Sequence, residues 1–190
     1  MNHQNRRNSF KSKIQHLTLA AILASGFAST AALAESLSPE VKAKIDIYQK
    51  KLIQWSKNPV IVKALKDGNT QGTAGLNNDQ WKTLKPRDPK VISFQTSQAG
   101  RFLTNLENDK SIGKLFLRDS KGNLVAGSKK PAIFNIAGRP AYENAMRGKT
   151  WVAGKVKADP TTKLQSVQLS APVMSEGKVI GVIHSSVTAE

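Results

Sequence analysis

The chain has 190 residues, with 29 Lys and Arg against 13 Asp and Glu, and it contains no cysteine. The lack of cysteine excludes disulfides, thiol chemistry and a closed zinc site of the usual His/Cys kind. The formal net charge of +16 attracts anions of every kind, from nucleic acid and acidic lipids to small carboxylates, so it does not by itself identify a partner.

Residues 1–34 carry the pattern of a secretory signal peptide. A basic start is followed by an apolar stretch from Leu17 to Ala28 and by the small-x-small pattern Ala32-Leu33-Ala34. The apolar stretch is shorter than the roughly 20 residues that a permanent membrane helix needs, and a retained N-terminal anchor is the alternative. We expect Sec-type cleavage after Ala34, a periplasmic or secreted protein, and one domain at residues 35–190.

Three helix starts are predicted where a capping residue directly precedes a proline: Ser38-Pro39, Asn58-Pro59 and Asp88-Pro89. The first helix is expected to end near Ser56, and its apolar residues form a single stripe. The second is expected to stop at Gly68, and the third is expected to be one long helix to about Asn108, weakened by Gly100. A further helical turn is predicted around Trp81.

The pattern becomes strand-like after Gly113. Two strands are predicted at Lys114–Arg118 and Asn123–Ser128 around a tight turn, and a short helix follows at Pro140–Arg147. Three closing strands joined by short polar turns indicate an antiparallel meander: Trp151–Ala158, Leu164–Val173 and Val179–Ile183. The predicted fold class is therefore α+β, with a five-stranded antiparallel sheet, a long N-terminal helix and a crossover helix.

Several segments resemble the Cache family of extracytoplasmic sensor domains, which are PAS-like. They are the hairpin at 117–125, the segment 139–145 with Gly148 and Trp151, and the strand segments 159–162, 170–173 and 177–183. The resemblance covers about residues 94–188 and implies a single domain that binds a small molecule on its sheet. Family members usually sit between transmembrane helices. We expect this chain to be a freestanding form that signals, in chemotaxis or another response, through a separate membrane-bound kinase, cyclase or chemoreceptor.

The resemblance also implies site residues. The pattern Arg-x-Trp-Tyr-x-x-Ala of amino-acid-binding members is met at Arg139, Tyr142 and Ala145, but alanine replaces the tryptophan. The family's tyrosine and aspartate at the end of the third strand correspond to Lys157 and Asp159. An aspartate that pairs with a ligand ammonium falls near Ser186. The carboxylate half of such a site is partly kept and its ammonium half is lost, which favours a simple carboxylate or another anion as ligand.

Strand alternation adds further candidates for the ligand site. Trp151 and Lys155 share a face with Lys157, and Gln168 shares one with Ser170 on the next strand. The alternatives are that Lys155 and Lys157 are exposed lysines, that Trp151 packs in the core, and that Arg139 is a surface arginine at a helix start. His184 is the only histidine after residue 34, so we expect no metal site. The sequence has no Gly-x-Ser-x-Gly elbow and no phosphate-binding glycine loop, so we also expect no cofactor and no enzyme.

Two other functions remain open from the sequence. A basic interaction protein could bind a polyanion or a receptor partner without a small ligand, or a Cache fold could have lost its pocket and serve a receptor structurally. Nucleic acid is disfavoured because aromatic residues, on which bases stack at such surfaces, make up only 6% of the chain. The first helix could form a homodimer through its apolar stripe, or it could cover the sheet of its own domain.

Overall fold

The three predicted helix starts are confirmed by side-chain caps. The computed structural model describes residues 37–72 and 75–189, and the expected signal peptide lies outside these residues. Helices α1 (Pro39–Trp55), α2 (Pro59–Gln71) and α4 (Pro89–Thr96) each begin with proline, which needs no N–H partner. The preceding Ser38, Asn58 and Asp88 side chains accept backbone N–H bonds of the first turn.

The predicted long third helix is wrong in one respect, because it is two helices. The backbone at Ser97 is extended (ψ 160°), so α4 ends at Thr96 and α5 (Gln98–Leu106) begins with Ser97 as its cap. Gly100 does not break the helix. It allows α5 to lie close to the end of α4, because a Cβ there would be 2.4 Å from the carbonyl oxygen of Phe94.

Helix α2 extends three residues beyond Gly68, where the sequence predicted its end. The glycine is needed for packing, since a Cβ at Gly68 would be 2.8 Å from the Cγ2 atom of Val125. The helical turn predicted around Trp81 is present as α3 (Asn78–Thr83). It has a capping box between Asn77 and Gln80 and buries the indole ring completely.

The predicted antiparallel sheet and α+β fold are confirmed. In spatial order the strands are β2 (Leu124–Gly127), β1 (Ile112–Arg118), β6 (Lys178–Thr188), β5 (Gln165–Ser175) and β3 (Trp151–Val152). The predicted third strand is split, because β3 and β4 (Lys157–Ala158) pair with β5 separately and residues 153–156 lie between them. Six strands therefore occupy five positions in the sheet.

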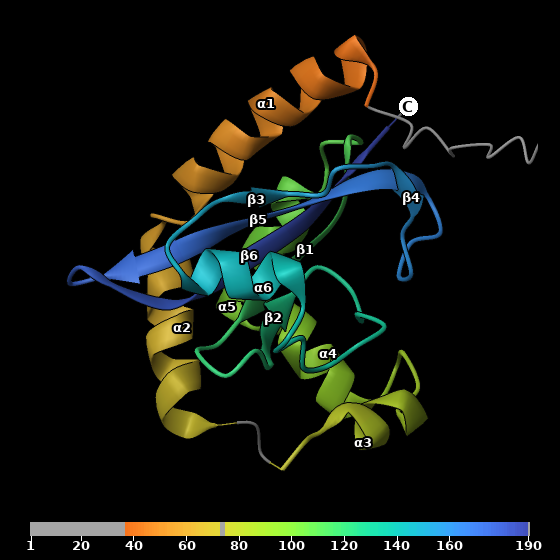
Figure 1. Cartoon of the computed structure of the whole chain (residues 1–190). Helices are drawn as coiled ribbons and strands as arrows, with labels where there is room; N and C mark the ends of the chain where they lie inside the picture. The colour runs from red at the N-terminus through yellow and green to blue at the C-terminus, as the bar shows by residue number, and fades with distance from the viewer. Residues whose placement is uncertain (1–36, 73–74, 190) are drawn as a thin grey trace, which may run out of the picture. The chain divides into compact units, whose positions relative to one another are not determined.

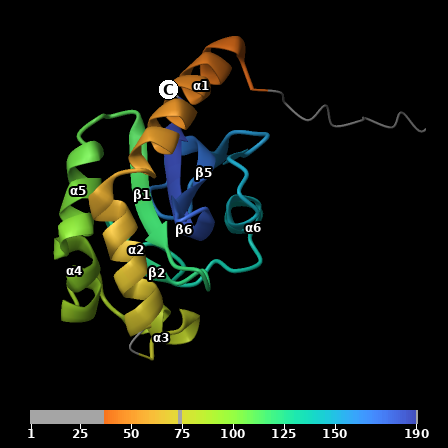
Figure 2. The ribbon, with the colours of Figure 1, turned by 90° about the vertical axis from the view of Figure 1, so that its left-hand side faces the viewer.

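Figure 2 shows helices α1, α2 and α5 on one side of the sheet and α6 (Pro140–Met146) on the other. The main apolar core lies between the sheet and helices α1, α2 and α5. These helices contribute Leu52, Leu65 and Leu103, and the strands contribute Leu115, Leu117, Leu169, Val173 and Ile183. The apolar stripe of α1 is used in this way, through Ile45, Tyr48 and Leu52, while Ile47 on its outer side is 55% exposed. The first helix thus covers the sheet of its own domain (Figure 1).

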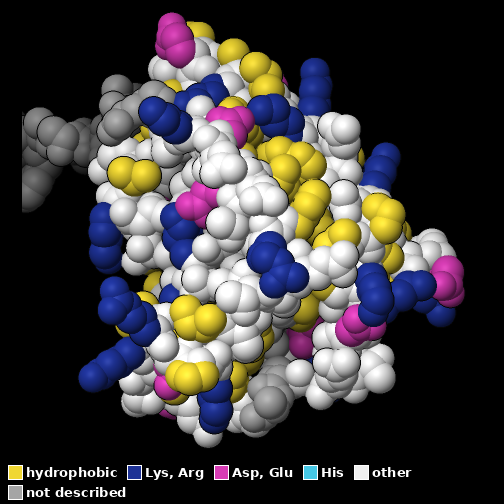
Figure 3. All heavy atoms as spheres, turned by 180° about the vertical axis from the view of Figure 1, so that it is seen from behind, with side chains coloured by type: hydrophobic (Ala, Val, Ile, Leu, Met, Phe, Trp, Pro, Cys, Tyr) yellow, Lys and Arg dark blue, Asp and Glu magenta, His cyan; other side chains and the backbone are white. Residues whose placement is uncertain are grey.

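No helix among residues 37–72 and 75–189 is long and apolar enough to cross a membrane. On the face drawn in Figure 3, Lys and Arg side chains are dispersed among polar and apolar ones and do not gather into one patch. The sheet face that α6 partly covers differs from the core face, because charged and polar side chains project from it.

A basic cavity on the α6 side of the sheet

Strand alternation brings three residues of β1 to the α6 side of the sheet. Leu115 and Leu117 lie in the core on the other side, so Lys114, Phe116 and Arg118 point the opposite way. Cross-strand pairing then places partners from β6 beside them. Phe116 pairs with His184, and Lys114 pairs with Ser186.

The third strand of the site is β5. Gln168 pairs with Ser186 and Ser170 pairs with His184, so β5 presents polar side chains to the same face. On the outer side of β5, Trp151 of β3 lies opposite Ser170, and Lys157 of β4 lies opposite Ser166.

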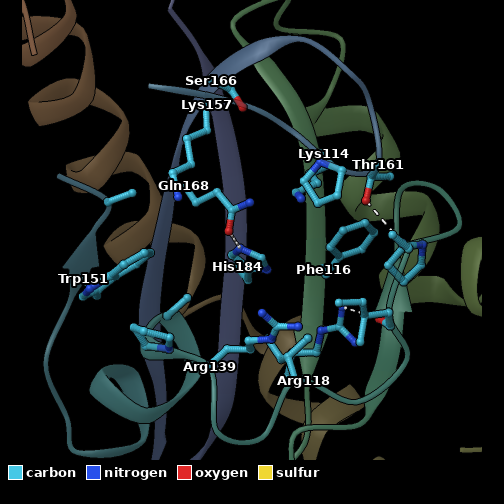
Figure 4. A pocket seen from close by; sticks show the side chains of 18 of the residues that line it. Lys114, Phe116, Arg118, Arg139, Trp151, Lys157, Thr161, Ser166, Gln168 and His184 are labelled. Carbon is cyan, nitrogen blue, oxygen red and sulfur yellow. Dashed lines mark hydrogen bonds between the residues drawn. The ribbon is translucent and has the colours of Figure 1, made fainter. Parts of the chain in front are cut away.

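These strands form the floor of a cavity of about 420 Å³, which α6 and two loops complete. Its apolar wall includes Phe116, Pro131, Ile133, Ile136, Pro140 and Trp151. Its basic residues are Lys114, Arg118, Arg139, Lys155 and Lys157. In Figure 4, Arg118 and Arg139 lie toward one end of the cavity and Lys114 and Lys157 toward the other, with His184 between them. Among the described residues that line it, none is Asp or Glu.

Arg118 is a buried cation without an acidic partner among the described residues. It is only 1% exposed, and its guanidinium donates hydrogen bonds to the carbonyl oxygens of Phe134 and Ile133 (3.2 Å to the latter). Burial lowers the pKa of Arg118 to about 9, although the nearby Asp119 raises it, so the group remains charged at neutral pH. A guanidinium has five N–H donors, and most of these are left for another partner.

Lys114, in contrast, has an acidic partner in the cavity wall. Its Nζ lies 2.5 Å from Oδ2 of Asp159, and the two side chains are 3% and 0% exposed. Burial lowers the pKa of Lys114, while Asp159 raises it. Burial would raise the pKa of Asp159, but the charge and hydrogen bond of Lys114 and the N–H groups of Thr162 and Thr161 together bring it below its usual value, so the carboxylate is ionised.

Gln168 connects this ion pair to His184. The amide nitrogen of Gln168 donates to Oδ2 of Asp159 at 3.4 Å, and its oxygen lies 3.2 Å from Nε2 of His184. If the amide donates to Asp159, its oxygen accepts from an Nε2–H of His184. Burial, and then the charges of Lys114 and Arg118, lower the pKa of His184 well below 6.5, so the imidazole is neutral at pH 7.

The structure brings five of the nine sequence-predicted site residues to the cavity wall: Arg139, Trp151, Lys155, Lys157 and Gln168. Arg139 is exposed at the start of α6, and Lys155 and Lys157 are exposed at the β3–β4 edge. The sequence missed Lys114, Phe116 and Arg118 as lining residues. The alternation of these three with Leu115 and Leu117 was the available signal, but the same pattern also fits a solvent-facing strand.

The other four predicted site residues do not line the cavity, and three of them bond elsewhere. The hydroxyl of Tyr142 donates to the carbonyl oxygen of Asp119 (3.3 Å), and burial raises its pKa to about 12. The hydroxyl of Ser170 donates to the Ala141 carbonyl oxygen at 2.5 Å, and Asp159 is held by Lys114. Ser186 is completely buried, and its Oγ has no hydrogen-bond partner in the described part of the chain.

No protein-family model matches the sequence, and no curated protein matches it. Among solved structures, the sensor domain of the V. cholerae histidine kinase DctB is 21% identical, over 78% of this chain and 50% of that chain, with a TM-score of 0.55. The sensory domain of the Campylobacter jejuni chemoreceptor Tlp3 (CcmL) with isoleucine bound is 15% identical, over 80% and 64% of the two chains, with a TM-score of 0.42.

The ligand-binding domain of the Pseudomonas fluorescens chemoreceptor CtaA in complex with L-alanine is 17% identical, over 78% and 56% of the two chains, with a TM-score of 0.39. This chain spans half the length of the DctB sensor domain that it matches. The likeness to DctB is one of fold, and this chain therefore has the fold of a sensor domain.

Proposed function

We propose that this protein is an exported Cache-type sensor domain that binds a small organic anion, with a carboxylate as its main recognised group, in the basic cavity. The observation that carries the proposal is Arg118, a guanidinium that is 1% exposed and lacks an acidic partner among the described residues. A buried charge is costly unless it is paired, and a bound anion would supply the missing partner.

The chemistry of the cavity supports a carboxylate. A planar guanidinium can hold both oxygens of a carboxylate at once, and Arg139 adds a second guanidinium to the lining. The volume of about 420 Å³ is within the usual range for small-molecule sites, and Phe116, Ile133 and Trp151 offer apolar contacts to a hydrocarbon portion.

We further infer that the domain, residues 35–190 after removal of the signal peptide, works in the periplasm and reports occupancy to a membrane-bound kinase, cyclase or chemoreceptor. In this scheme the protein is not an enzyme and needs no cofactor. Support comes from the shared fold with a sensor domain of a histidine kinase. A homodimer through α1 would have to use its outer side, where Ile47 is exposed, because the buried stripe of α1 packs on the sheet.

A thermal-shift screen tests the proposed ligand class. Each carboxylic acid is paired with its primary amide and with the amine of the same carbon skeleton, so that the charge and hydrogen bonding of the head group change while the carbon skeleton is kept. We expect carboxylates alone to raise Tm, and Arg139→Met to reduce the shift without unfolding the protein, because Arg139 is exposed. Arg147→Met is the control, since Arg147 is exposed near the end of α6 and does not line the cavity.

Two results would contradict the proposal. Equal stabilisation by amines, amides and acids would mean that charge recognition is absent. Binding of a polyanion that weakens steeply with salt, without any small carboxylate that binds, would favour the basic interaction protein instead.

A further inference from the structure

The ion pair between Lys114 and Asp159 has a consequence for ligand selection. Asp159 is bonded directly to the lining residue Lys114 and, at 3.4 Å, to the lining residue Gln168. Its carboxylate is completely buried behind them, at 0% exposure.

All acceptor positions of this carboxylate are used within the protein. Oδ1 accepts the backbone N–H groups of Thr161 and Thr162 at 2.8 Å and 3.0 Å. Oδ2 accepts from Lys114 and from the amide of Gln168. A carboxylate has about four lone-pair positions, so Asp159 has none left for a ligand.

Lys114 and Asp159 come from segments that β6 and β5 separate in the sheet. Lys114 projects from β1, whereas Asp159 follows β4, and the lysine side chain itself forms part of the cavity lining. Its ammonium therefore takes the place beside the Asp159 carboxylate at the cavity wall.

We propose that Lys114 is a specificity-determining residue: as a tethered ammonium, it occupies Asp159 and makes the cavity select organic anions that lack a positively charged amino group. The part of this inference that concerns binding of an organic anion rests on the proposed function. A ligand carrying both a carboxylate and an ammonium would have to place its ammonium among the cations Arg118, Arg139 and Lys157 without a free acceptor carboxylate, and this is unfavourable.

A chemical-rescue experiment tests the role of Lys114 without any knowledge of the natural ligand. Lys114→Ala removes three methylene groups and the ammonium, and n-propylammonium restores the same atoms. Because the variant leaves a buried carboxylate unpaired, we expect Tm to fall by about 10 °C. Saturating n-propylammonium should recover most of this loss, and 1-propanol, its neutral counterpart, should recover little.

Two controls separate the ion pair from its surroundings. In the double variant Lys114→Ala, Asp159→Asn the space is the same and the amide oxygen can still accept from Thr161 and Thr162, but the negative charge is gone. This variant should not respond to n-propylammonium. Lys82→Ala breaks an exposed ion pair with Asp79, whose side chains are 69% and 91% exposed, and should neither lose stability nor be rescued.

A second measurement uses the unmodified protein, so it does not depend on whether Lys114→Ala folds. 4-Methylpentanoate and leucine differ only in the ammonium group. We expect the acid to bind at least about 100-fold more tightly than the amino acid, which corresponds to the cost of leaving one buried charge without a partner. Equal affinity for the two, or rescue of the double variant by n-propylammonium, would overturn the role of Lys114.

The two proposals can fail separately. If the parent binds neither compound nor any other carboxylate, the proposed function is wrong, and the rescue experiment still reports whether Lys114 occupies Asp159. If the parent binds leucine as well as it binds the acid, the anion site stands and the specificity role of Lys114 is wrong.

Discussion

Replacing Arg118 by methionine should abolish tight binding of a carboxylate while leaving the protein folded. Methionine keeps much of the length and the apolar character of the arginine stem but supplies no N–H donor. Arg118 uses two donor groups on the carbonyl oxygens of Phe134 and Ile133 in the absence of ligand. The remaining donors can serve a ligand carboxylate.

The size of the effect follows from this count. A hydrogen bond to a charged group contributes about 1.5–3 kcal/mol, so two such bonds contribute about 3–6 kcal/mol. The low end of that range corresponds to a weakening of Kd by about 100-fold or more. The two carbonyl groups that lose their donor do so in both the free and the bound protein, so their cost cancels in the comparison of affinities.

Isothermal titration calorimetry with the tightest carboxylate from the screen measures this difference, and circular dichroism checks that the variant is folded. Arg147→Met is the matched control, because it removes an exposed arginine outside the cavity. If a folded Arg118→Met protein binds the carboxylate within about threefold of the parent, the buried guanidinium does not recognise the ligand, and our reasoning about the site is wrong.

Three further predictions concern stability. Because the folded pKa of His184 is depressed below 6.5, the unfolded chain takes up a proton first as the pH falls. The free energy of unfolding, measured by urea denaturation, should therefore decrease below pH 6.5 by up to about 1.4 kcal/mol per pH unit, and His184→Gln should remove this dependence. A parent protein with the same stability from pH 7 to pH 5 would contradict a buried neutral imidazole. Gly122→Ala should lower the free energy of unfolding by about 1–3 kcal/mol, because φ is +86° and a Cβ would be 2.6 Å from the Ala137 nitrogen. Gly154→Ala, where a Cβ would have no atom within 4 Å, should be nearly neutral, and equal effects of the two variants in thermal unfolding would show that strain at Gly122 is not the cause. Leu103→Ala should destabilise by about 2–5 kcal/mol in the same assay, since Leu103 is completely buried between α5 and the sheet, and a loss below about 1 kcal/mol would contradict that packing.

Local chemistry explains what the sequence predicted well. The caps before Pro39, Pro59 and Pro89 act within one helical turn, and they fixed three helix starts correctly. The antiparallel order of the closing strands follows from short polar turns. The break at Ser97 was harder to predict, because serine is compatible with a helix interior and becomes a cap only when α5 turns away from α4.

The candidate site was predictable only in part, because its central contacts join distant segments. Alternation from Lys157 placed Trp151 and Lys155 on the same wall, and both line the cavity. The pairing of Lys114 with Asp159 depends on how β1 and the residues after β4 are brought together across β5 and β6, which no local pattern reports. The same is true of the burial of Arg118, which depends on the loop that carries Phe134.

A crystal structure of the protein with its tightest-binding carboxylate would show directly whether the basic cavity is the binding site. We expect carboxylate oxygens within hydrogen-bond distance of the Arg118 and Arg139 guanidinium groups, with the Lys114–Asp159 ion pair intact. A ligand bound outside this cavity, or one whose ammonium displaces Lys114 from Asp159, would contradict this expectation.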